Sequence, residues 1–207
     1  MRCPRRGRTR RVRDGFVLTS ALLFLALSIA CTPRYDGELF PPDFEVWEHP
    51  GSSVELRGRM SARAVGTYRA EALVLARERY HSAALTPASD IDLVLGWGDF
   101  GTPSFREPFR FRLRNRRFLF NRRVPYALRE QALGQCGLVN TFPKDLETRT
   151  ALRRLRPGDV VVLEGKLIDL SDSWWEYATS RSHPRQVGHG SQVFVWVERV
   201  EVVFRGR

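Results

Sequence analysis

The sequence has little cysteine and almost no lysine. Its three cysteines, Cys3, Cys31 and Cys136, are too few and too scattered for the disulfide framework of a small secreted domain. Lysine occurs only at Lys144 and Lys166, so nearly all of the positive charge is arginine. A GC-rich genome also produces such an excess, and the amount of arginine alone therefore does not indicate a site.

Recognisable catalytic and metal-binding motifs are lacking as well. The chain contains no nucleophile elbow, no zinc-protease helix and no paired carboxylates in a clear context. No cofactor, metal site or catalytic residue is predicted. The sequence therefore favours a binding or structural protein over an enzyme.

The first thirty residues have the form of a secretory signal. Seven arginines and one aspartate lie within the first fifteen residues, and residues 16–30 carry no charge. The basic segment stays on the cytoplasmic side while the apolar run enters the bilayer. At ~1.5 Å per residue this run spans roughly 22 Å, which is short against a hydrocarbon core of about 30 Å.

Cys31 follows the apolar run directly. The segment Leu27–Cys31 resembles a bacterial lipobox, the signal for attaching lipid to a cysteine, with Ser28 in place of the usual aliphatic residue. We therefore expect lipidation at Cys31, with an uncleaved anchor or conventional cleavage as alternatives. Lipid or anchor would hold the protein at a membrane of the bacterial cell envelope, on the periplasmic (extracytoplasmic) face.

The rest of the chain divides into a tether and one domain. Residues 31–53 are rich in proline and are expected to drape over the domain surface. Residues 54–207 are expected to form a single domain, because the 177 residues after position 30 suffice for one core but not two. The first fifteen residues hold +6 of the net charge of +11, so the mature chain is near +5.

Hydrophobic periodicity predicts a β-rich domain. Residues 67–80 fit both a helix and a core strand, and the neighbouring strands favour a strand. A short helix is expected after Pro125, and a clearer one over 144–155. Strands are expected at 54–59, 91–95, 109–114, 160–170 with an irregularity at Gly165, 174–179 and 192–204. The fold class is therefore α+β: a curved antiparallel sheet or a small barrel with one or two packed helices.

Two resemblances refine this expectation. Residues 155–160, followed by 163–167, resemble the strand opening of oligonucleotide-binding-type (OB-like) small barrels. Gly96-Trp97-Gly98, together with residues 87–90, Asn140 and Pro143, loosely resembles a group of uncharacterised bacterial exported proteins that share a Gly-Trp-Gly element. That resemblance implies an envelope protein and no particular activity.

The strongest candidate site is an arginine-rich stretch. Residues 106–129 contain nine arginines and one glutamate, Glu107, with Glu130 directly after them, and in residues 109–114 phenylalanine or leucine alternates with arginine. As a strand, the arginines would share one face and could bind an anion. Export argues against nucleic acid, so the expected partner is an anionic envelope component, with a plain solvated strand face as the alternative. The candidate residues are Arg110, Arg112, Arg114, Arg116 and Arg117.

Two weaker candidates lie near the C-terminus. Trp174 and Trp175 could stack on a glycan of the cell wall, or simply pack in the core. His183 and His189, in a polar loop, could serve an envelope hydrolase or bind a metal, although spacing fixes no third ligand. A structural subunit of an envelope complex, with the Phe/Arg stretch as its interface to a protein partner, is a third possibility.

Metabolic labelling tests the predicted anchor. Cells supplied with a fatty-acid analogue should label the wild-type chain, and Cys31→Ala should lose that label because the acylated thiol is gone. A membrane-bound wild-type protein without label would instead mean that residues 16–30 remain as an uncleaved anchor.

Overall fold

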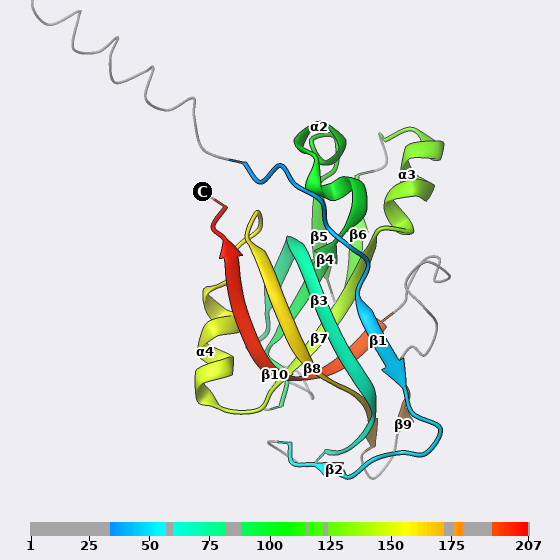
Figure 1. The fold of residues 1–207 in the computed structure, drawn as a ribbon, viewed down its shortest axis with the longest axis vertical. Coiled ribbons are helices and arrows are strands. Elements are labelled where there is room, and N and C mark those ends of the chain that lie inside the picture. Colours follow the sequence, from blue (N-terminus) through cyan, green and yellow to red (C-terminus); the bar gives the residue numbers. More distant parts are fainter. Residues whose placement is uncertain are drawn as a thin grey trace, which may run out of the picture. The chain divides into compact units, whose positions relative to one another are not determined.

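Five strands form the central layer of the domain (Figure 1). They are β3 (Ser61–Arg79), β4 (Ile91–Gly96), β7 (Cys136–Pro143), β8 (Val160–Ser171) and β10 (Gln192–Phe204). The structure is a computed structural model, and it describes residues 34–206 except 57–59, 82–87, 115, 122–123, 172–175 and 180–191.

The pairings of these strands close a ring. β3 pairs with β8 through its first two thirds and with β4 through its last third. β4 pairs with β7, β7 with β10, and β10 with β8, which returns to β3. Apolar side chains from the strands fill the inside, among them Leu93, Leu163 and Val195, each fully buried. The α+β, β-rich fold class is thus confirmed, although β7 and β10 run parallel and the sheet is mixed rather than antiparallel.

The connectivity explains the parallel pair. Parallel neighbours need a crossover connection, and here it contains α4 (Leu146–Arg154) and then β8. Asp145 begins α4, because its carboxylate accepts a hydrogen bond from the Thr148 amide at 2.8 Å. Leu152 and Leu155 pack into the core of the ring. The five strands therefore form a ring with a helix between its third and fourth strands.

The ends of the domain differ in part from the sequence-based expectations. Residues 67–79 lie in strand β3, as favoured, and the predicted helices are present as α3 (Tyr126–Leu133) and α4. The proline-rich segment is more than a surface drape, because β1 (Asp43–Val46) and β2 (Ser53–Val54) pair with β3. The irregularity expected at Gly165 lies in the ladder with β10, where the register shifts between Val197 and Arg199.

An insertion of about forty residues joins β4 to β7. It contains η1 (Gly98–Gly101), α2 (Pro103–Arg106), β5 (Phe111–Arg114), β6 (Arg117–Phe120) and α3. Its aromatic side chains pack on Val94 and Leu138, which point to the opposite side of the sheet from the core of the ring. The insertion therefore covers the outer face of β4 and β7. Outside it, β9 (Glu176–Tyr177) extends the sheet by pairing with β8.

Candidate anion-binding site

The hairpin β5–β6 separates apolar from basic side chains. Phe111, Leu113 and Phe118 pack into the cluster beneath the insertion, as the alternation in the sequence predicts. The cross-strand partners Arg112 with Leu119, and Arg114 with Arg117, lie on the other face. All four of these side chains are exposed. We call Arg112, Arg114, Arg117 and Leu119 the outward face of the hairpin.

Two like charges face each other at the end of this hairpin. Arg114 and Arg117 are direct partners across the two strands. Like charges in directly opposite positions destabilise a strand pair unless something lies between them. Within the part of the chain that the structure describes, no ion pair involves Arg112, Arg114 or Arg117.

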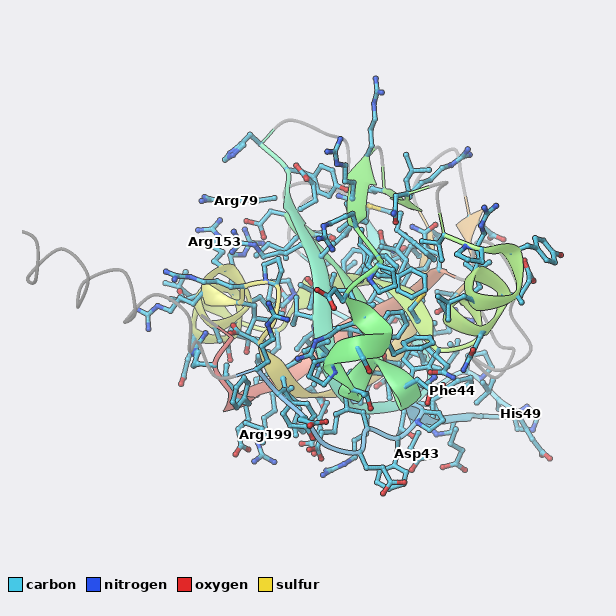
Figure 2. All side chains as sticks on the ribbon, turned by 90° about the horizontal axis from the view of Figure 1, so that it is seen from above. Asp43, Phe44, His49, Arg79, Arg153 and Arg199 are labelled. Carbon is cyan, nitrogen blue, oxygen red and sulfur yellow. The ribbon has the colours of Figure 1, made fainter. Side chains whose placement is uncertain are left out.

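Several arginines elsewhere on the surface pair with carboxylates. Arg199, labelled in Figure 2, pairs with Glu164 at 3.2 Å and also with Glu201. Arg153, labelled on another side of the same view, pairs with Asp90 at 2.5 Å, and Arg205 pairs with Asp159 at 2.9 Å. Among the described residues, the arginines of the outward face therefore lack the acidic partners that these three arginines have.

Arg110 lies beside this face at the base of the hairpin. Its side chain is exposed, and Nη1 donates to the carbonyls of Glu107 at 2.6 Å and Phe109 at 2.8 Å. Asn121 closes the base, accepting from the Arg110 amide at 3.1 Å and donating to the Pro108 carbonyl at 2.9 Å. These hydrogen bonds hold Arg110 next to Arg112 without neutralising the positive charge of Arg110.

Arg116 takes a different place from the other four candidate arginines. It has a positive φ of 55°, and its side chain turns back towards the barrel, where only 14% of it is exposed. Its guanidinium pairs with Asp92 of β4 at 2.8 Å, donates to the Ser89 carbonyl at 2.7 Å and lies 4.5 Å from the centre of the Tyr80 ring. Arg116 is thus an anchor of the hairpin rather than part of its outward face.

The partner of Arg116 is a carboxylate buried in an apolar strand. Asp92 is fully buried, and burial raises its pKa to about 6, while the Arg116 charge and the Tyr80 hydroxyl act in the opposite direction. The Asn140 and Gln192 amides, 2.9 Å apart, extend the polar cluster onto β7 and β10. An aspartate inside an otherwise apolar strand is the sequence signal for this cluster.

The first described residues are fixed beside the insertion. Arg106 of α2 donates to the carbonyl of Tyr35 at 2.6 Å, and the amide of Gly98 donates to the carbonyl of Leu39 at 2.8 Å. The Tyr35 ring packs edge-on against Phe204 of β10. In Figure 1 the chain accordingly enters beside α2 and the hairpin. The first described residues therefore lie close to α2 and the hairpin.

Most of the other candidate residues from the sequence lie outside the part of the chain that the structure describes. Cys31, Trp174, Trp175, His183 and His189 lie outside the described residues. Cys136 is buried, and burial raises the pKa of its thiol to about 12, which leaves it protonated and unreactive at neutral pH. No group of three or more potential metal-ligating side chains occurs among the residues that the structure places.

Comparison with protein-family models, curated proteins and solved structures finds no match to this chain. Within the described ranges, no helix has both the length and the apolar character needed to cross a membrane.

The buried Asp92 predicts an unusual pH dependence of stability. Its folded pKa of about 6 lies above the ordinary value of 3.8, so its contribution favours folding at low pH and is lost as the pH rises through 6. Between pH 7.5 and pH 5 the free energy of unfolding should gain about 1 kcal/mol from this group.

Urea unfolding of the full chain in neutral detergent at both pH values, beside Asp92→Asn, measures this gain. The wild type should gain about 1 kcal/mol over the variant as the pH falls. Equal pH dependence of the two proteins would show that the pKa of Asp92 is not raised.

Proposed function

We propose that this chain is a membrane-tethered protein of the bacterial envelope, and that its barrel domain is a non-catalytic module that binds an anionic component of that membrane. The observation that carries the proposal is the outward face of the hairpin. Arg114 and Arg117 face each other there, exposed and without a carboxylate among the described residues. A phosphate placed between them would replace a repulsion with two charge-assisted hydrogen bonds.

The free energy with which the hairpin binds an anionic membrane surface can be estimated from its charges. Each arginine near an anionic membrane surface contributes about 1 kcal/mol. Arg112, Arg114 and Arg117 together would therefore hold the hairpin on that surface by about 3 kcal/mol. Leu119, 57% exposed among them, and Tyr126 on α3, 72% exposed, add apolar contacts suited to the head-group region.

The position of Cys31 in the chain also supports an orientation in which the outward face of the hairpin lies on the membrane. Cys31 precedes Tyr35 by four residues, which span at most about 14 Å when extended. Arg106 fixes Tyr35 to α2, and the Phe105 and Phe109 rings, 5.5 Å apart, connect α2 to the hairpin. A lipid at Cys31 would therefore bring the membrane to the end of the domain that carries the outward face.

Nucleic acid is a poorer candidate for the anion. Small barrels of the oligonucleotide-binding type bind oligonucleotides on the face of their second and third strands. Here these strands are β4 and β7, and the insertion covers their outer face. The secretory signal also sends the chain to a compartment where lipid phosphates are the abundant anions.

Hydrogen exchange of the full chain in vesicles tests the proposal. In vesicles that contain phosphatidylglycerol, residues 111–120 should exchange several-fold more slowly than in vesicles of phosphatidylcholine alone. The protection should disappear in 1 M salt, where screening acts within about 3 Å. Replacing Arg112, Arg114 and Arg117 with glutamate should abolish it.

A matched charge change provides the control. Arg63, Arg154 and Arg156 are exposed outside the hairpin, and their replacement by glutamate alters the net charge equally while leaving the protection intact. Equal loss of protection in both triple variants would show that the protection depends on net charge alone and not on the hairpin arginines. No protection of the wild type in either vesicle would refute the proposal.

A further inference from the structure

A groove of about 540 Å³ lies between the edge of β3 and the hairpin strand β5. Its volume falls within the range of small-molecule sites. One wall is the last part of β3, another is the start of β5, and the Pro157-Gly158 turn closes one end. All of its lining residues lie in the described part of the chain.

The groove exists because β3 changes partners. Its pairing with β8 ends at Leu73, and the Gly158 amide then donates to the Val74 carbonyl at 2.8 Å. The register with β4 shifts between Val74 and Ala76, so Leu75 is an extra residue in the strand. Beyond it, the edge of β3 that faces away from β4 pairs with no described strand, and this edge forms the wall.

The floor of the groove is apolar. Leu75 is only partly buried, and Phe109 and Phe111 line the opposite wall with their rings 5.9 Å apart. Leu73, Phe109 and Leu113 are nearly buried, at 2%, 4% and 9% exposure. An apolar floor of this kind suits a hydrocarbon chain, because burying the chain removes its surface from water.

The rim carries an excess of positive charge. Four arginines line the groove against one glutamate, Glu78: Arg77, Arg106, Arg110 and Arg112. The hydrogen bonds of Arg106 go to the carbonyls of Phe100, Gly101 and Tyr35. Arg77 and Arg110 likewise donate to carbonyls. The carbonyl groups orient these guanidinium groups but do not neutralise their positive charges.

We infer that this groove holds one acyl chain of an anionic lipid, with the lipid phosphate among the arginines of the rim. The inference rests on the proposed function, since Arg112 belongs both to the rim and to the outward face, and it specifies that one lipid is bound individually. Charge complementarity selects the anionic head group, and the apolar floor selects the chain.

Native mass spectrometry of the full chain in neutral detergent tests this. Lysophosphatidylglycerol and lysophosphatidylcholine with the same chain serve as probes, because they differ in head-group charge. The expected result is a single adduct with the anionic lipid and about tenfold less with the zwitterionic one, because the choline ammonium group beside the phosphate is repelled by the rim arginines. Excess glycerol phosphate, which has the head group without the chain, should not displace the adduct.

Two variants test the groove itself. Leu75→Trp fills the floor and should remove the adduct, whereas Val203→Trp, at an exposed position of β10, should keep it. Arg110→Glu should weaken the adduct at least as much as the change of head group does, with Arg63→Glu as its control. Equal adducts with both lipids, or an adduct that survives Leu75→Trp, would overturn the inference.

Failure of this inference is distinct from failure of the proposed function. Arg114 and Arg117 do not line the groove. Slower exchange of the hairpin on anionic vesicles without a lipid adduct would leave surface binding in place and refute the groove. Displacement by glycerol phosphate would show a phosphate site without a chain site, which also refutes it.

Discussion

The ion pair between Asp92 and Arg116 determines how the hairpin lies on the barrel. Two strands of four residues are marginal on their own in water, so the hairpin depends on what it packs against. Arg116 adopts a positive φ at the turn and reaches a carboxylate that is fully buried in β4. Removing Arg116 would leave the Asp92 carboxylate buried and unpaired, which costs about 3–5 kcal/mol. The pair thereby fixes which face of β5 and β6 points outward.

The position of the hairpin, fixed by this ion pair, also determines which arginines form the basic surface. With Phe111 and Phe118 directed inward, Arg112, Arg114 and Arg117 must face solvent, because successive strand residues alternate. The same docking places β5 opposite the free edge of β3 and so creates the groove. The insertion covers the outer face of β4 and β7 and presents a basic surface in its place.

Local patterns in the sequence predicted local structure well. The alternation at 109–114, the helix after Pro125 and the long strand from 192 are all present. Strand β7 was missed, because Asn140 and Thr141 interrupt its apolar run; their buried polar groups are satisfied by Gln192 and by the Ile91 carbonyl. The closed ring and the contact of Arg116 with Asp92, 24 residues apart, depend on which strands meet in space, and no local pattern records that.

The central claim is that the outward face of the hairpin meets the membrane. Photocrosslinking in living cells tests it most directly, with Leu119→benzoylphenylalanine in the full chain and Leu146→benzoylphenylalanine as the exposed control on α4. The account predicts a phospholipid adduct at position 119, several-fold stronger than at position 146. Equal lipid adducts at both positions, or a protein adduct alone at position 119, would contradict it.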